Sequence, residues 1–217
     1  MPCPVYSFEY QNILTFLFYL VIFFSEVTAV RQSAKQQAAP GKELSMNTLR
    51  KIYCRAFQKA FHIAIPFLPY RKPKIAGSVK ELPEIIMRHK CTHVLIITDG
   101  GIMKLGLTRR LEKALKEAGI PYTIYDKTVA NPTTVNVREA LELYHKEDCD
   151  AIIGFGGGSS MDCAKAVGAC AVKPNQSLAQ MKGILKVHKK LPLLMAVPTT
   201  AGTGSETTLA AVITDAD

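Results

Sequence analysis

The sequence predicts an α/β fold of the Rossmann-like type, in which helices flank a mostly parallel β-sheet. From residue 75 onward, short apolar runs alternate with amphipathic segments, as expected for strands that are buried on both faces and connected by helices. Two glycine-rich loops each follow an apolar run directly. They would lie at the carboxyl ends of parallel strands, which is where such sheets bind ligands.

The individual elements follow from hydrophobic periodicity and from residues that begin or end helices. The predicted strands cover residues 92–98, 122–126, 150–155, 192–198 and 210–215. The predicted helices cover residues 107–119, where Gly119 ends the helix, 131–148 after an initial turn, and a segment that begins near Ser159.

The first glycine-rich loop, "GFGGGSSMD" at 154–162, is the strongest local signal. Glycines allow the backbone to approach a phosphate closely, and the N-terminus of the next helix favours an anion at the same place. Ser159 and Asp162 have the spacing of a capping box with Asp in place of Glu. Three consecutive glycines exceed what a tight turn needs, so the loop favours pyrophosphate binding. It departs from GxGxxG because Ser159 replaces the last glycine.

Two further strand ends add polar groups to the same edge. The loop "PTTAGTGSETT" at 198–208 is rich in hydroxyls that can donate hydrogen bonds to phosphate or carboxamide oxygens. The segment "TDGG" at 98–101 is either a simple turn or a ribose site. In a ribose site, Asp99 would accept hydrogen bonds from both adenosine ribose hydroxyls and repel a 2′-phosphate, which favours NAD over NADP.

The N-terminal residues 1–45 differ in composition from the rest. The apolar run at 13–24 is shorter than the roughly 20 residues of a membrane-spanning helix. Three interpretations stay open for this run. It is a secretory signal sequence, although no Lys or Arg precedes it, or a membrane anchor, or part of an extension upstream of a natural start at Met46. We expect residues 1–45, including the polar linker at 31–43, to lie outside the fold, and residues 46–217 to form one α/β domain.

Composition narrows the classes of partner and compartment. The formal net charge is +9 and the isoelectric point about 9.3, but the basic residues are scattered and lack interleaved aromatic side chains. This pattern argues against nucleic-acid binding. The six cysteines form no CxxC pair, and the five histidines show no metal-ligand spacing. Free thiols indicate a reducing, cytoplasmic compartment, while the apolar run at 13–24 leaves membrane association or secretion open.

At these motifs the chain resembles the iron-containing alcohol dehydrogenases, which are metal-dependent, NAD(P)-linked enzymes. "GGGSSMDCAKAVG" at 156–168 and "PTTAGTGSETT" at 198–208 resemble the family's two signature segments. "VLIITDGGIMKLGL" at 94–107 and "VANPTTVNV" at 129–137 fit the family in the same order. The resemblance covers roughly 46–217. It implies an N-terminal nucleotide-binding α/β domain, a C-terminal helical domain, and an active site between them.

The resemblance also assigns residues to the cofactor. Asp99 would bind the adenosine ribose, and Asn131 would lie beside the cofactor. The pyrophosphate region would be held by Gly157, Gly158, Ser159 and Asp162. On the side toward the nicotinamide, the nucleotide would be lined by the side chains of Thr199, Thr200 and Thr203. Thr208 is a further candidate for this role.

The metal site of the family is where the chain departs from it. The family holds Fe²⁺ or Zn²⁺ with one Asp and three His from beyond the second signature segment, and Asp215 and Asp217 come too early to be that Asp. We therefore assign no catalytic or metal-binding residue, and expect a fragment or truncated product without the helical domain. Its activity would be hydride transfer between a small alcohol and its aldehyde or ketone.

Three alternatives stay open at this point. One is a membrane-anchored basic protein, which the apolar run at 13–24 supports and the two motifs do not. A glycerol dehydrogenase or dehydroquinate synthase-like relative would also carry a GGGS loop. A non-catalytic nucleotide-binding module could pair with a separately encoded helical half. The sequence also leaves association into a homo-oligomer open.

Overall fold

The computed structural model describes residues 5–8, 55–56, 74–183, 186–187, 189–208 and 210–216. The chain divides into two compact units, and the elements below belong to the unit made of residues 1–11, 71–181 and 189–217. The other unit comprises 12–70 and 182–188. The apolar run, the linker and the domain boundary expected near Met46 lie outside the described residues. No helix within the described part is long and apolar enough to cross a membrane.

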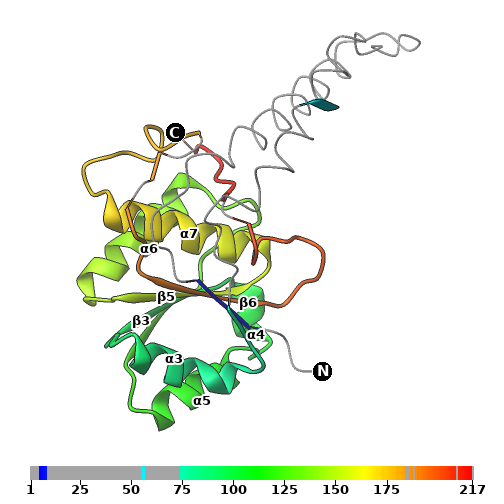
Figure 1. Ribbon diagram of the computed structural model, residues 1–217, viewed down its shortest axis with the longest axis vertical. Coiled ribbons are helices and arrows are strands. Elements are labelled where there is room, and N and C mark those ends of the chain that lie inside the picture. The colour runs from blue at the N-terminus through cyan, green and yellow to red at the C-terminus, as the bar shows by residue number, and fades with distance from the viewer. Residues whose placement is uncertain are drawn as a thin grey trace. The chain divides into compact units, whose positions relative to one another are not determined.

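The described strands form one six-stranded sheet in the order β2-β1-β6-β5-β3-β4 (Figure 1). The four strands from β6 to β4 are parallel, and β1 is antiparallel to both of its neighbours. The strands are β1 (Val5–Phe8), β2 (Lys74–Ala76), β3 (Val94–Ile97), β4 (Tyr122–Tyr125), β5 (Ala151–Gly156) and β6 (Leu193–Pro198). The predicted α/β fold with a mostly parallel sheet is confirmed.

Helices cover both faces of this sheet. In Figure 1, α6 and α7 lie over one face, and α3 and α5 lie over the other. The helical elements are η2 (Val79–Glu81), α3 (Leu82–Arg88), α4 (Gly100–Lys104), α5 (Arg109–Glu117), α6 (Thr134–Lys146) and α7 (Gly158–Val172). Alternate strand residues point to opposite faces. Ile96 and Ile153 therefore pack with α3 and α5, whereas Leu95 and Ile152 pack with α6 and α7.

The strand predicted at 210–215 is wrong. The backbone of this segment forms hydrogen bonds with Pro132 and Thr134, at the entry to α6, and the Val212 N–H donates to the Asp162 side chain on α7. The backbone groups of Val212 and Thr214 therefore bond to residues in the first turns of α7 and at the entry to α6. The segment crosses those helices instead of extending the sheet.

The first strand also differs from the expectation that residues 1–45 lie outside the fold. Val5–Phe8 pairs with β6 on one side and with β2 on the other, in the register Tyr6↔Ala196 and Tyr6↔Ile75. β6 would otherwise present unpaired backbone groups at a sheet edge. A short segment of β-branched and aromatic residues is suited to cover that edge.

Helix α7 packs closely on the central strand β5 because Gly154 lacks a side chain. A Cβ atom at Gly154 would lie 3.1 Å from both the Ala164 Cβ and the Met161 Cα. Of these contacts, the one with Met161 is to backbone, which cannot rotate away. The glycine therefore brings the first turns of α7 against the end of β5, next to the glycine-rich loop.

This packing predicts opposite effects for the same substitution at two glycines. Gly154→Ala should lower the free energy of unfolding by about 1–3 kcal/mol, because it overpacks the α7–β5 contact. Gly168→Ala is the matched control within α7, since a Cβ there would lie 3.6 Å from Ile152 Cδ1 in ordinary contact. It should stabilise the helix by up to about 1 kcal/mol. Urea denaturation measures both, and equal effects would contradict the packing argument.

Candidate functional site

Three loops meet at the carboxyl edge of the parallel sheet. They follow β3, β5 and β6, and the sheet register places Ile97 beside Gly154 and Gly156 beside Pro198. The N–H of Thr199 donates to the Gly156 carbonyl over 2.8 Å, which joins the beginnings of the two glycine-rich loops. The prediction that these strand ends face one place is confirmed.

Asp99 follows β3 and is the N-cap of α4. Its Oδ1 accepts hydrogen bonds from the N–H groups of Gly101 and Ile102, at 2.9 Å and 3.0 Å. Its Oδ2 lies 3.4 Å from the position that a Cβ of Gly156 would occupy. One oxygen therefore holds the α4 turn while the other faces the first glycine-rich loop.

Gly156 is required in this arrangement by its backbone and by its surroundings. Its φ of +143° lies in a region that L-residues rarely adopt. A Cβ there would also lie 2.7 Å from the Ser160 Oγ. The Ser160 hydroxyl is buried and has no hydrogen-bond partner among the described residues. It lies in the first turn of α7.

The start of α7 differs from the predicted capping box. Gly157 is the N-cap, and no described side chain caps the helix there. The Ser159 Oγ instead accepts a hydrogen bond from the Asn131 N–H over 3.3 Å. The early N–H groups of a helix lack intrahelical partners, and they favour an anion. The missing cap therefore leaves the first turn of α7 suited to an anionic ligand.

The glycines of the first loop make room for the second. A Cβ at Gly157 would lie 3.4 Å from the Thr200 Oγ1, and one at Gly158 would lie 3.0 Å from the Ser205 Oγ. Thr203 also approaches Gly158, at 3.4 Å from the same built position. The structure thus brings the predicted residues of both loops together, with hydroxyls on one side and bare backbone on the other.

Asn131 lies just before a polar network that was not identified from the sequence. Asn131 itself has a φ of +56°, which Asn tolerates better than most residues. Just after it, Thr133 and Asn136 form a capping box at the start of α6. The buried Asn136 amide also donates to the Tyr125 hydroxyl and the Lys127 carbonyl. The spacing T-x-x-N before an amphipathic helix is the signal that could have revealed it.

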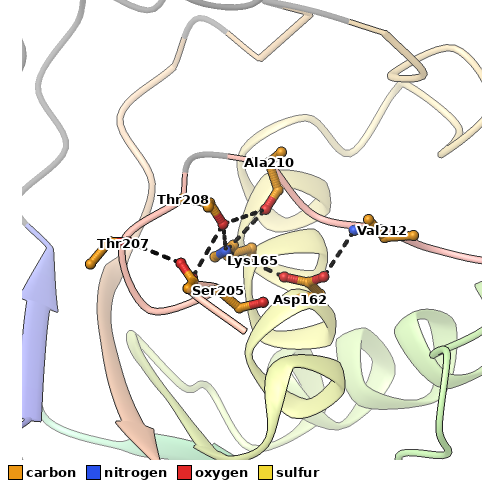
Figure 2. Close-up of polar contacts among 8 residues, drawn as sticks. Asp162, Lys165, Ser205, Thr207, Thr208, Ala210 and Val212 are labelled. Carbon is orange, nitrogen blue, oxygen red and sulfur yellow. Dashed lines mark hydrogen bonds and ion pairs between the residues drawn. The ribbon is translucent and has the colours of Figure 1, made fainter. Parts of the chain in front are cut away.

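Asp162 and Thr208 make contacts within the protein that were not expected (Figure 2). Both are hydrogen-bonded to the ammonium of Lys165, which is buried in α7. Burial lowers the pKa of Lys165, and the Asp162 and Glu206 carboxylates oppose that shift. Lys165 was also missed from the sequence, although a lysine three residues after an aspartate in a nearly all-apolar helix was a usable signal.

No group of three or more His, Cys, Asp or Glu side chains within the described residues could hold a metal ion. The described cysteines are protonated thiols at neutral pH. Burial raises the pKa of Cys91 and Cys170 to about 11, and that of Cys149 and Cys163 to about 12. The three loops therefore offer backbone N–H groups, hydroxyls and the carboxylates of Asp99 and Glu206, a set of groups that can bind a polyhydroxylated anion.

Comparisons with known proteins point in one direction. The family model described as iron-containing alcohol dehydrogenase matches residues 75–217. A protein named choline dehydrogenase from Bacillus subtilis is 41% identical over 141 residues, which are 64% of this chain and 35% of that protein. An NAD-dependent methanol dehydrogenase from Bacillus methanolicus is 37% identical, over 69% of this chain and 39% of its own length.

Solved structures that resemble the chain are also dehydrogenases, oxidoreductases or reductases by name. A 1,3-propanediol oxidoreductase has a TM-score of 0.60 and 37% identity, covering 64% of this chain and 36% of that one. A sulfoacetaldehyde reductase from Bifidobacterium kashiwanohense, solved in complex with NAD⁺, has a TM-score of 0.56 and 29% identity, covering 63% and 36%. The chain spans well under half the length of the relatives that it matches.

Two substitutions of Asp99 distinguish the effect of its helix-capping hydrogen bonds from the effect of its negative charge. Asp99→Ala should lower the free energy of unfolding by about 1 kcal/mol, because the N-cap of α4 is lost. Asp99→Asn should leave stability almost unchanged, because Asn caps helices as well as Asp does. Thermal unfolding of both variants is the measurement. A similar loss in both would mean that the carboxylate charge, and not the cap, stabilises this turn.

Proposed function

The chain belongs to the iron-containing alcohol dehydrogenase family, and on that premise we propose that it is the cofactor-binding part of an NAD-dependent alcohol dehydrogenase. The reaction of the whole enzyme would be hydride transfer between a small alcohol and its aldehyde or ketone. The described residues would bind and orient the nicotinamide dinucleotide. A cytoplasmic location and a homo-oligomer remain predictions.

The observation that carries this proposal is the bare backbone of Gly157 and Gly158 between the first turn of α7 and the hydroxyls of the second loop. A Cβ atom at Gly157 would lie 3.4 Å from the Thr200 Oγ1, and one at Gly158 would lie 3.0 Å from the Ser205 Oγ, so side chains there would crowd the second loop. A pyrophosphate needs close N–H donors and a positive helix end, and both lie here. Gly157, Gly158 and Ser159 would hold it.

The remaining predicted residues extend the site on both sides. Asp99 would accept hydrogen bonds from the ribose hydroxyls through its Oδ2, since its Oδ1 already accepts hydrogen bonds in the α4 cap. Its charge would disfavour a 2′-phosphate, which supports NAD over NADP. Thr199, Thr200 and Thr203 would line the nucleotide toward the nicotinamide, and Asn131 would flank it. The contacts of Asp162 and Thr208 with Lys165 argue for a supporting role for these two.

The nicotinamide ring supplies the hydride chemistry when the cofactor is bound. The chain's own residues would fix the dinucleotide against the sheet edge and determine which part of it projects beyond the loops. The described residues do not fit the metal that the family's name implies, because no cluster of suitable ligands lies among them. Their proposed role is therefore binding and orientation of the cofactor.

Calorimetric titration of the full chain with NAD tests the proposal. Saturable binding is expected, and Gly157→Val should weaken it at least about tenfold, which is roughly 1.4 kcal/mol, by filling the space between the loops. Asp99→Asn should reduce the preference for NAD over NADP while leaving the fold stable. Gly168→Ala, on the same helix but against the core, is the control.

Two outcomes would count against the proposed function. If the folded chain does not bind NAD, the proposed function is wrong for this chain on its own. Binding that Gly157→Val leaves unchanged would place the nucleotide elsewhere.

A further inference from the structure

We propose that Lys165 is a positioning residue of the nucleotide site, which holds residues 205–208 and 210–212 against α7 and thereby sets the shape of the hydroxyl-rich loop. We call Lys165, Asp162 and Thr208 together the clamp. In this proposal Asp162 and Thr208 hold the segment and do not contact the cofactor. The inference rests on the proposed function for its link to NAD. The clamp itself can be tested without any ligand.

The ammonium of Lys165 has an acceptor for each of its three protons (Figure 2). Nζ donates to Asp162 Oδ1 over 3.3 Å, to Thr208 Oγ1 over 3.0 Å and to the Ala210 carbonyl over 3.0 Å. The lysine itself is only 6% exposed. Two of its three acceptors, Thr208 at the end of the second glycine-rich loop and Ala210 just beyond it, lie far along the chain from α7.

Asp162 completes the clamp from the other side. Its Oδ2 accepts a hydrogen bond from the Val212 N–H over 3.1 Å, while its Oδ1 is held by Lys165. Both carboxylate oxygens are therefore used within the protein. Each member of the ion pair bonds to a backbone group of the same segment, Ala210 for the lysine and Val212 for the aspartate. The pair determines where this segment crosses α7.

The clamp is connected to the proposed site through contacts of Thr208 and Ser205. The Thr208 hydroxyl, which accepts from Lys165, lies within hydrogen-bond distance of the Ser205 carbonyl, at 3.4 Å. Ser205 in turn places its Oγ 3.0 Å from the position that a Cβ of Gly158 would occupy. A continuous set of contacts thus runs from the buried ammonium to the space beside Gly158.

An ion pair is a costly way to obtain stability alone. Buried pairs can often be replaced by apolar residues at little cost, whereas removing one partner leaves an uncompensated charge. The pair instead fixes the path of the segment, because three hydrogen bonds to or from its charged groups hold Thr208, Ala210 and Val212. This difference separates a positioning role from a merely structural one.

The test compares Lys165→Met with the double variant Asp162→Asn/Lys165→Met in the full chain. Thermal unfolding, amide hydrogen exchange of peptides from 199–216, and NAD affinity by calorimetry are measured for each. Lys165→Met should be less stable, and the double variant should recover part of the stability because its carboxylate charge is gone. Both should lose about tenfold or more in exchange protection over 205–212 and in NAD affinity.

Lys113→Met is the matched control, since Lys113 is an exposed helical lysine with a surface ion pair to Glu117. It should change none of the three measurements. If Lys165→Met does not fold, Thr208→Val removes one acceptor at an exposed residue and should give the same losses without unfolding. Thr208→Ser keeps the hydroxyl and should restore both protection and affinity.

Two results would overturn the inference. If the double variant regains protection and NAD affinity together with its stability, Lys165 is only one half of a structural ion pair. If Lys165→Met folds and leaves both measurements unchanged, the clamp does not order the segment. Failure of the unmodified chain to bind NAD would instead overturn the proposed function, while hydrogen exchange would still decide the clamp.

Discussion

The contact between α7 and β5 is the constraint on which the rest of the site depends. Gly154 allows the helix to approach the central strand, so that the first turn of α7 begins directly after the strand ends. That turn then meets the loops after β3 and β6. The same helix carries Lys165 and Asp162, which hold the segment after the second loop. A wider α7–β5 spacing would displace every one of these groups together.

The fold and the meeting of three loops could be predicted because both follow from local patterns. Continuous apolar runs identified β3 to β6, and parallel strands bring the residues at their carboxyl ends to one edge. Lys165 and Asn136 were missed because most of their partners are distant in the sequence or are backbone atoms, although each also has a side-chain partner three residues away. Asp162 lay in a recognised motif, but its spacing suggested a cap, whereas its oxygens face Lys165 and Val212.

The errors at the two ends of the chain have a related cause. Residues 5–8 resemble any short β-prone segment, and only the open edge of β6 makes them a strand. Residues 210–215 have equally suitable composition, but α6 and α7 offer their backbone other hydrogen-bond partners. In both cases the neighbouring backbone decided the structure, which residue propensity does not encode.

The pairing of β1 with β6 has a consequence for how the chain folds during synthesis. β1 precedes both of its partner strands in the sequence, and far more of the chain separates it from β6 than from β2. Pairings of such long sequence separation form slowly, since the intervening loop must close first. β1 can therefore pair with β2 before β6 has been made, and we expect the closing of the sheet at β6 to be a late event in folding.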